Sequence, residues 1–312
     1  MARELLVVDT TGRTHYPDEA LAQIADLPVR LQTVRATEPD EVIAACRDAD
    51  AILMTAARIT REVLMALPRL RAIVRYGVGL DTIDLAAACE LGVTVRNVTD
   101  FCTDEVADHT LALVLALARG IVDYARHTRA GQWRGGRVRP LLRLRGRRAG
   151  IIGLGAIGRA VAARLQALGM EVVASDPAVD AEVARGLGVR LLGLDELLAT
   201  SEVVCVNCPL TDQTRHLIGA DELARMRPTA ILVNTARGGI IDETALVQAL
   251  AEGRIAGAGL DVLEREPPAE DNPLLRMDNV IVTPHVAAAS REAGHEVVVG
   301  AFRRLAEVLR GV

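Results

Sequence analysis

Short apolar runs alternate with helical patterns along the first 96 residues of the chain. The runs that predict strands are Leu5–Val8, Ala51–Met54, Ala72–Arg75 and Thr94–Val95. The patterns that predict helices are Pro17–Ala25, Pro39–Arg47, Arg61–Leu67 and Ile83–Leu91. Such a strand–helix alternation indicates an α/β fold with a parallel sheet.

A long amphipathic helical stretch, rich in Ala and Leu, is predicted over residues 103–130. Residues 131–148 then carry seven arginines, two adjacent glycines and the single tryptophan. An arginine run can bind nucleic acid, but the net charge of −5 and the absence of lysine count against that use. A solvated or intersubunit arm is the favoured interpretation.

Strand–helix units resume over residues 149–285. The predicted strands here are Ala149–Ile152, Glu171–Ser175, Val203–Asn207, Ile231–Asn234, Gly257–Leu260 and Val280–Thr283. A helix over Arg159–Leu168 connects the first two of them and ends at Gly169, and residues 290–309 are predicted to form a C-terminal helix. The chain is therefore expected to carry two successive sets of α/β units.

Length and charge restrict the possible architectures and partners. A chain of 312 residues exceeds the size at which single cores stop growing, so two domains are expected. The net charge of −5 disfavours binding to nucleic acid or to anionic membranes, and only six residues are aromatic, which argues against a base-stacking surface. No apolar run approaches the ~20 residues of a membrane span.

All 36 basic residues are arginine. Schiff-base catalysis, pyridoxal-phosphate chemistry and a phosphate-binding loop of the Walker type each require a lysine amine. The absence of lysine excludes these three classes.

The cysteines and the first residues bear on the compartment. Five cysteines, an odd number in a long chain, are typical of a reduced cytoplasmic protein, and the apolar start Leu5–Val8 is too short for a secretion signal. Cys205 and Cys208 form a C-x-x-C, but no second pair accompanies them and they overlap a predicted strand. A structural role is favoured over redox use, and no metal site is expected.

A glycine turn follows the first strand of the second set. It reads Gly153-Leu154-Gly155-Ala156-Ile157-Gly158, between a strand and a helix. The first glycine permits the tight turn, the second lets the backbone approach a pyrophosphate, and the third allows close helix–strand packing. The helix N-terminus then favours the phosphates. This context predicts a dinucleotide site.

Asp176 stands at the end of the next strand, 18 residues beyond Gly158. A carboxylate at this spacing accepts the ribose hydroxyls of NAD and repels the 2′-phosphate of NADP. NAD is therefore the predicted cofactor, although an aspartate before Pro177 could also serve only the turn.

Three residues of catalytic type follow three later strands: Arg237, Glu266 and His285. A guanidinium offers a planar pair of donors suited to a substrate carboxylate. The glycines Gly238 and Gly239 would let the backbone approach a ligand. A carboxylate beside an imidazole raises the imidazole pKa and fixes its tautomer, so that the pair can exchange a proton near neutral pH. Each residue could instead be an ordinary surface or capping group.

The ordered motifs resemble the D-isomer-specific 2-hydroxyacid dehydrogenases over about residues 50–290. The matching segments are Arg75–Asp81, Gly153–Gly158, Asn207–Thr211, Asn234–Gly239, Asp261–Pro267 and Pro284-His285. The resemblance implies a Rossmann-type NAD-binding domain, residues 99–285, inserted into a discontinuous flavodoxin-like substrate domain, residues 1–98 and 286–312. It also implies a homodimer formed through an arm at about residues 100–145.

The same resemblance implies the roles of individual residues. Arg237 would hold the substrate carboxylate and polarise its carbonyl, and His285 would be the proton donor with Glu266 as its partner. Further substrate contacts would come from Tyr76, Gly77, Val78 and Gly79. The residues that would line the cofactor are Val78, Gly153, Gly155, Ala156, Ile157, Gly158, Asp176, Cys208, Pro209, Thr214, Thr235, Ala236, Arg237, Asp261 and His285.

Departures from the pattern limit the substrate assignment. Met54 and Thr55 stand where phosphoglycerate dehydrogenases usually carry an arginine–serine pair, and the chain ends at Val312, without the regulatory domain that many of them append. Residues 97–98 and 105–108 are more similar to the C-terminal-binding-protein corepressors of the family. This similarity makes an NAD-sensing interaction protein with little turnover the alternative to an enzyme. The tryptophan that the corepressors carry after the catalytic histidine is missing after His285. Formate oxidation releases only carbon dioxide and a hydride and would need no imidazole–glutamate acid pair, so Glu266 argues against that activity. A small 2-keto or D-2-hydroxy acid is the expected substrate.

Overall fold

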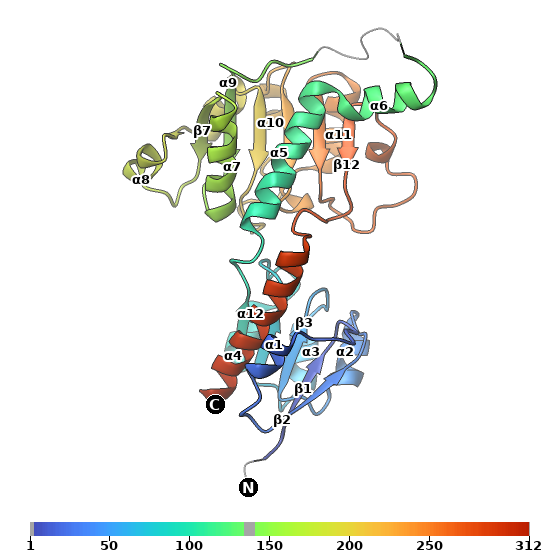
Figure 1. Ribbon diagram of the computed structural model, residues 1–312, viewed down its shortest axis with the longest axis vertical. Coiled ribbons are helices and arrows are strands. Elements are labelled where there is room, and N and C mark those ends of the chain that lie inside the picture. Colours follow the sequence, from blue (N-terminus) through green and yellow to red (C-terminus); the bar gives the residue numbers. More distant parts are fainter. Residues whose placement is uncertain (1–2, 134–140, 312) are drawn as a thin grey trace. The chain divides into compact units, whose positions relative to one another are not determined.

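The computed structural model describes residues 3–133 and 141–311, and the chain divides into two α/β units (Figure 1). One unit comprises Met1–Cys102 and Ala289–Val312, and the other comprises Thr103–Ala288. The second unit is thus inserted into the sequence of the first. Part of the predicted intersubunit arm, residues 134–140, lies outside the described residues.

The first unit contains a parallel sheet of five strands in the order β2-β1-β3-β4-β5. The strands are β1 (Leu5–Asp9), β2 (Val29–Thr33), β3 (Ala51–Met54), β4 (Ala72–Arg75) and β5 (Thr94–Asn97). Every residue of β3 is buried, as expected of a central strand covered by helices on both faces. The strand order 2-1-3-4-5 is that of flavodoxin-like folds, the type of domain that the family resemblance implied.

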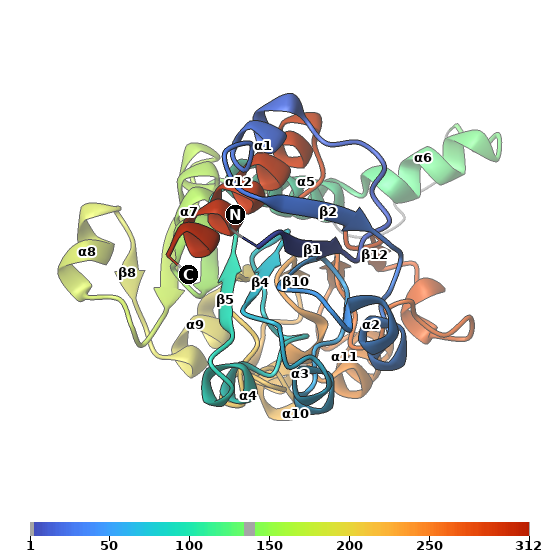
Figure 2. The same ribbon diagram turned by 90° about the horizontal axis from the view of Figure 1, so that it is seen from below.

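Helices cover both faces of this sheet (Figure 2). One face carries α2 (Pro39–Cys46), α3 (Arg61–Ala66) and α4 (Leu85–Glu90). The other carries α1 (Asp18–Ala22) and the long C-terminal helix α12 (Arg291–Arg310). Phe302 of α12 is fully buried against this second face, which stabilises the unit by roughly 1.5–3 kcal/mol. The C-terminal helix therefore completes the core of the N-terminal sheet.

The inserted unit contains seven parallel strands in the order β12-β11-β10-β9-β6-β7-β8. They are β6 (Arg148–Ile152), β7 (Glu171–Ser175), β8 (Arg190–Leu191), β9 (Val203–Val206), β10 (Ile231–Asn234), β11 (Gly257–Leu260) and β12 (Val280–Val282). The strand order reverses direction between β6 and β9. Ligands of open α/β sheets bind at such a point, beyond the carboxyl ends of the strands.

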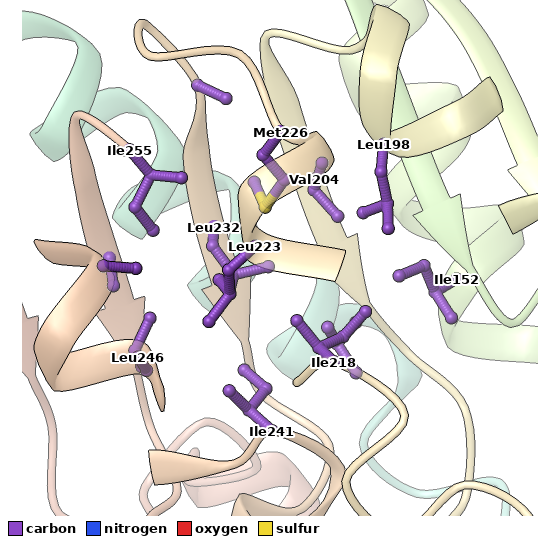
Figure 3. Packing of buried hydrophobic residues seen from close by; sticks show 14 of the residues in the cluster. Ile152, Leu198, Val204, Ile218, Leu223, Met226, Leu232, Ile241, Leu246 and Ile255 are labelled. Atoms are coloured by element: carbon purple, nitrogen blue, oxygen red, sulfur yellow. The ribbon is translucent and has the colours of Figure 1, made fainter. Parts of the chain in front are cut away.

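Two apolar clusters lie on opposite faces of the seven-stranded sheet. One face packs against α9 (Leu194–Thr200), α10 (Ala220–Arg225) and α11 (Glu243–Ala251), as the side chains in Figure 3 show. The other face packs against α5 (Thr103–Arg119), α7 (Ala156–Ala167) and α8 (Ala181–Gly186). The remaining helices are α6 (Ile121–Arg129) and the short η1 (Gly238–Ile240) and η2 (Pro273–Leu275). The predicted α/β class is confirmed.

Three elements differ from the prediction. The edge strands β2 and β8 were not predicted, because β2 is only partly buried and β8 has two residues. The helical stretch predicted over residues 103–130 is wrong as one helix, since it breaks into α5 and α6 at Gly120, whose φ is 61°. Glycine adopts this left-handed conformation without the steric cost that a side chain would add.

Candidate active site

Three neighbouring strands of the inserted unit carry Arg237, Glu266 and His285 beyond their ends. The strands β10, β11 and β12 pair directly and run parallel. Arg237 follows β10, Glu266 lies in the loop after β11, and His285 follows β12. Because the carboxyl ends of parallel strands share one sheet edge, residues 29 and 19 positions apart in sequence meet there.

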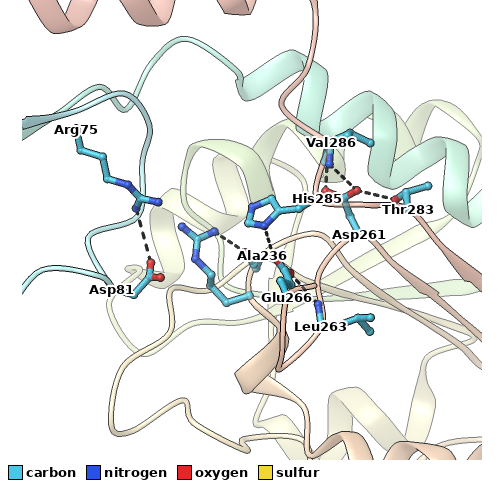
Figure 4. Close-up of polar contacts among 11 residues, drawn as sticks. Arg75, Asp81, Ala236, Asp261, Leu263, Glu266, Thr283, His285 and Val286 are labelled. Atoms are coloured by element: carbon cyan, nitrogen blue, oxygen red, sulfur yellow. Dashed lines mark hydrogen bonds and ion pairs between the residues drawn. The ribbon is translucent and has the colours of Figure 1, made fainter. Parts of the chain in front are cut away.

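His285 and Glu266 form a hydrogen-bonded ion pair (Figure 4). The Nδ1 atom of His285 lies 2.6 Å from Oε2 of Glu266, and the two side chains are about half and one-third exposed. The hydrogen bond to Glu266 raises the pKa of His285 above its ordinary value of 6.5. Burial alone would raise the pKa of Glu266, but the bonds from His285 and from the backbone of Leu263 outweigh it and hold that pKa below 4.5. The pair therefore favours the protonated imidazole, and because its bond uses Nδ1, it leaves Nε2 for another partner.

The backbone at His285 is held in a left-handed conformation, with φ at 54°. Its N–H donates to the carbonyl oxygens of Asp261, at 2.8 Å, and Thr283, at 3.0 Å. The Asp261 carboxylate, which is buried, accepts hydrogen bonds from Thr283 Oγ1 and from the backbone N–H groups of Val286 and Ala287 (Figure 4). A non-glycine residue in this conformation needs such support from its surroundings. The network around Asp261 therefore fixes the direction of the imidazole.

The loop that carries Glu266 is locked to the loop that carries Arg237. Oε1 of Glu266 accepts a hydrogen bond of 2.9 Å from the N–H of Leu263. A Cβ atom at Gly238 would collide with the backbone of Leu263 and Glu264. The expectation that this glycine makes room for a ligand is thus wrong: the neighbour that requires it is the protein's own β11 loop.

Arg237 belongs to the same electrostatic group. Its charge lowers the pKa of both Glu266 and His285, after larger effects from burial and from the bond between the two. The turn is built by Asn234, whose Nδ2 donates to the carbonyl oxygen of Arg237 and whose Oδ1 accepts from the N–H of Ala236. Nη1 of Arg237 donates to the Ala236 carbonyl at 2.7 Å, which orients the guanidinium. The three predicted catalytic residues therefore lie within one interacting set.

The glycine turn after β6 fits the backbone approach of a pyrophosphate. A Cβ at Gly153, where φ is 93°, would lie 2.6 Å from the backbone nitrogen of Cys208, and a Cβ at Gly158 would collide with the carbonyl of Gly153. At Gly155, by contrast, an added Cβ would meet no atom within 4 Å. Two glycines are thus required by packing within the protein, and the third faces open space at the N-terminus of α7, where unsatisfied N–H groups attract anions.

Asp176 lies directly after β7 and beside this turn. Its Oδ2 accepts a hydrogen bond of 2.7 Å from the N–H of Leu154, and Oδ1 accepts one of 2.9 Å from Ala178. The carboxylate is only partly buried. Asp176 therefore serves the turn and also places a negative charge next to the glycine loop.

The other predicted cofactor residues of this unit lie in three places. Cys208, Pro209 and Thr214 follow β9, where Thr214 Oγ1 donates to the Pro209 carbonyl at 2.6 Å. Thr235 and Ala236 follow β10, and Thr235 is buried. Ala156 and Ile157 open α7. They follow β6, β9 and β10, the two strands that flank the reversal point and the next strand of the sheet, and their contact with a cofactor stays a prediction.

The C-x-x-C motif is buried in and beside β9. Burial raises the pKa of Cys205 to about 12 and that of Cys208 to about 11, and both cysteines are free. Thiols at such pKa values are poor nucleophiles and poor metal ligands near neutral pH. Among the described residues no cluster of His, Cys, Asp and Glu that could hold a metal ion is found.

The predicted substrate loop, Tyr76–Gly79, lies in the other unit and follows β4. The hydroxyl of Tyr76 donates to the buried carboxylate of Asp9 at 2.8 Å, and burial raises the pKa of Tyr76. This side chain therefore anchors the loop. Gly77 has a φ of 142°, and in the described part of the chain the backbone N–H groups of Val78 and Gly79 donate to no protein acceptor. Backbone donors of this kind suit a carboxylate.

Residues 111–287 match the profile described as "D-isomer specific 2-hydroxyacid dehydrogenase, NAD binding domain". The chain belongs to this family. It is 45% identical over 242 residues to a D-3-phosphoglycerate dehydrogenase of Archaeoglobus fulgidus, covering 78% of this chain and 46% of that protein. It is 42% identical over 256 residues to a glyoxylate reductase of Korarchaeum cryptofilum, covering 80% and 77%.

A solved structure of a family relative is similar over nearly its whole length. The D-lactate dehydrogenase of Aquifex aeolicus, complexed with NAD and lactic acid, superposes with a TM-score of 0.86 at 28% identity, covering 98% of this chain and 96% of that one. The chain spans about half the length of the phosphoglycerate dehydrogenases that it matches. It contains the NAD-binding domain of the 2-hydroxyacid dehydrogenases. No helix among the described residues is long and apolar enough to cross a membrane.

One histidine beside this candidate site was not predicted from the sequence. His109 lies on α5, and its Nε2 is 2.9 Å from Thr283 Oγ1 and 3.6 Å from Oδ1 of Asp261. It stands mid-helix and 174 residues from Thr283, so no local signal marked it. Only the crossing of α5 over the sheet brings it to the site, and that crossing cannot be deduced from a single sequence.

Proposed function

We propose that the protein is an NAD-dependent oxidoreductase that interconverts a small 2-keto acid and the corresponding D-2-hydroxy acid. The observation that supports it most directly is the 2.6 Å pair of His285 and Glu266 on strand ends next to Arg237. An acid of raised pKa beside a permanent cation is what carbonyl reduction of a keto acid requires. Family membership gives the reaction class.

Arg237 is proposed to bind the substrate. Its guanidinium can hold the carboxylate through two parallel hydrogen bonds and can also polarise the neighbouring carbonyl oxygen. It keeps its charge at any working pH. As negative charge develops on the carbonyl oxygen, a fixed cation stabilises the transition state more than the ground state.

His285 is proposed to deliver the proton. NADH, when bound, supplies the hydride that adds to the carbonyl carbon. His285 then gives its Nε2 proton to the carbonyl oxygen, and in the oxidative direction it takes that proton back. Glu266 remains ionised throughout and keeps the Nδ1 side of the ring occupied, so that Nε2 is the nitrogen that exchanges the proton.

The cofactor contacts follow from the glycine turn. The open space at Gly155 and the first N–H groups of α7 would receive the pyrophosphate, and Asp176 would accept the adenosine ribose hydroxyls. The negative charge of Asp176 favours NAD over NADP. Residues 99–285 would form this domain, while residues 1–98 and 286–312 would form the substrate domain, with Tyr76–Gly79 as its carboxylate contact.

The substrate is proposed to be a small unphosphorylated 2-keto acid, such as glyoxylate or hydroxypyruvate. Relatives are named glyoxylate reductase and glycerate dehydrogenase as well as D-3-phosphoglycerate dehydrogenase. Neither Met54, an uncharged and fully buried thioether, nor the neutral Thr55 offers a cation to a phosphate. This favours the reductases over the phosphoglycerate enzymes.

A homodimer through α5, α6 and the following arm is proposed as well. The apolar residues Ile121, Val122 and Trp133 are 57%, 49% and 82% exposed. Ile121 and Val122 are consecutive, and neighbouring exposed apolar side chains favour an interaction surface. Sedimentation of the purified protein would report a monomer if the proposal is wrong.

Steady-state assays test the activity. The purified protein is mixed with NADH and with glyoxylate, hydroxypyruvate, pyruvate or 3-phosphohydroxypyruvate, and the loss of NADH absorbance is followed. We expect turnover with one of the first three and preference for NADH over NADPH. A wild-type protein that binds NADH but reduces no member of a broad 2-keto acid panel would contradict the proposal.

A further inference from the structure

We propose that His109 of α5 is a positioning residue for His285, acting through Thr283 and Asp261. The inference rests on the proposed function for its kinetic consequence, but its structural content is independent of turnover. His109 itself points at no reacting group; its Nε2 contacts the hydroxyl of Thr283, just before His285 in sequence.

The direction of the hydrogen bonds follows from counting protons. A threonine hydroxyl has a single proton. Thr283 donates it to Oδ1 of Asp261 at 2.6 Å. The Oγ1 of Thr283 must therefore accept the bond of 2.9 Å from His109, so Nε2 of His109 carries a proton. The chain of bonds runs in one direction, from His109 through Thr283 to Asp261.

Asp261 in turn holds the backbone turn that carries His285. It is 1% exposed, and its carboxylate accepts from the N–H groups of Val286 and Ala287 at 3.0 and 2.8 Å. Its backbone carbonyl accepts from the N–H of His285 at 2.8 Å. Asp261 thus bonds the backbone on both sides of the His285 side chain, and the left-handed φ of that residue depends on these bonds.

Close packing of α5 makes the contact possible. A Cβ at Gly259 in β11 would lie 3.1 Å from Cβ of Leu113 and from Cδ1 of Leu117. The bare glycine lets the helix approach the strand, which brings the N-terminal half of α5 to the ends of β10 and β12. Next to His109, Thr110 contacts Thr235 Oγ1 at 2.7 Å, beside Arg237. One turn of α5 therefore contacts the segment before His285, through Thr283, and the segment before Arg237, through Thr235.

The substitution His109→Leu tests the role, because leucine fills much of the space but donates no hydrogen bond. We expect kcat to fall by about tenfold or more, since small misplacements of a catalytic group cost up to about 100-fold. The Kd for NADH and the Tm should stay close to those of the wild type. His109→Gln, which can place an amide N–H near Thr283, should restore most of the activity. His295→Ala, an exposed histidine on α12, is the matched control.

A double-mutant cycle with Thr283→Val tests the pathway. If His109 acts through Thr283, the variant that carries both His109→Leu and Thr283→Val should lose no more activity than the worse single variant. Fold-losses that multiply, unchanged kcat in His109→Leu, or a failure of His109→Gln to recover activity would each overturn the proposal.

A titration separates this proposal from the proposed function. The groups that face His285 electrostatically are Glu266, Arg237 and Asp261. When the turn loosens, the bond to Glu266 is made less often, so the pKa of His285 measured by NMR should fall toward its ordinary value in His109→Leu. This readout requires no substrate: an unchanged titration would overturn the positioning role, whereas a wild-type protein without turnover would overturn only the activity.

Discussion

The Nδ1 atom of His285 and the Oε2 atom of Glu266 lie 2.6 Å apart, although the two residues follow different strands. The bond uses one nitrogen of the ring and directs the other away from the carboxylate. It also sets opposite pKa shifts on its two members, upward for His285 and downward for Glu266. Two residues that lie beyond the ends of adjacent strands thus form an ion pair that leaves the second ring nitrogen clear of the carboxylate.

Replacing His285 by alanine removes the proposed acid. General acid catalysis contributes about 100-fold to 10,000-fold, and we expect kcat for keto-acid reduction to fall by that amount. NADH binding, measured by fluorescence titration, should change little because the glycine turn is untouched. A variant that retains full kcat would show that the proton comes from elsewhere.

Replacing Glu266 by glutamine keeps the shape of the side chain and removes its charge. The pKa of His285 is raised chiefly by Glu266, so it should fall toward 6.5 in this variant. In the proposed mechanism reduction requires protonated His285 and is lost as pH rises through that pKa. The basic limb of the pH profile for reduction should therefore move to lower pH, so that kcat at pH 8 falls more than kcat at pH 6. A limb that stays in place would separate Glu266 from the titration of His285.

Replacing Asp176 by asparagine tests cofactor choice. Asparagine retains an acceptor for the N–H of Leu154 but carries no charge. Loss of hydrogen bonds to a charged group costs about 1.5–3 kcal/mol, so the Kd for NADH should rise by roughly tenfold to 100-fold. The kcat/KM for NADPH should rise relative to that for NADH. An unchanged ratio would assign Asp176 to the turn alone.

Two glycines of the turn should respond differently to alanine. In Gly158→Ala the new methyl group collides with the carbonyl of Gly153, which should destabilise the unit by about 1–3 kcal/mol and lower the Tm. In Gly155→Ala it meets no protein atom, so the Tm should be unchanged while the Kd for NADH rises. Equal NADH affinity in Gly155→Ala and the wild type would mean that the open space is not the cofactor site.

Local patterns explain why much of the fold could be predicted. Buried parallel strands such as Ile231–Asn234 are continuous apolar runs, and the glycine turn lies between a strand and a helix in sequence as in space. His285 and Glu266 were found because each follows such a run. Their 2.6 Å contact could not be deduced, since it depends on the order of β11 and β12 in the sheet.

Features without a local pattern were missed or misinterpreted. The edge strand β2 is too exposed to form an apolar run, and Gly120 breaks a helix within an uninterrupted amphipathic pattern. The position of His109 beside Thr283 depends on how α5 packs on the sheet. Gly238 was attributed to a ligand, whereas the atoms that require it belong to a loop 25 residues downstream. For His109 and Gly238 the cause is a contact between segments distant in sequence.

The crowding of Gly238 against Leu263 has an evolutionary consequence. A methyl group at position 238 would push the segment that carries Arg237 away from the loop that carries Glu266. The sequences of these two segments therefore cannot change independently of each other. Under the proposed function, changes in substrate preference are therefore expected in the unit formed by Met1–Cys102 and Ala289–Val312, where exchanging loops leaves the contact between positions 238 and 263 intact. Laboratory selection for new substrates would do best to randomise that unit first.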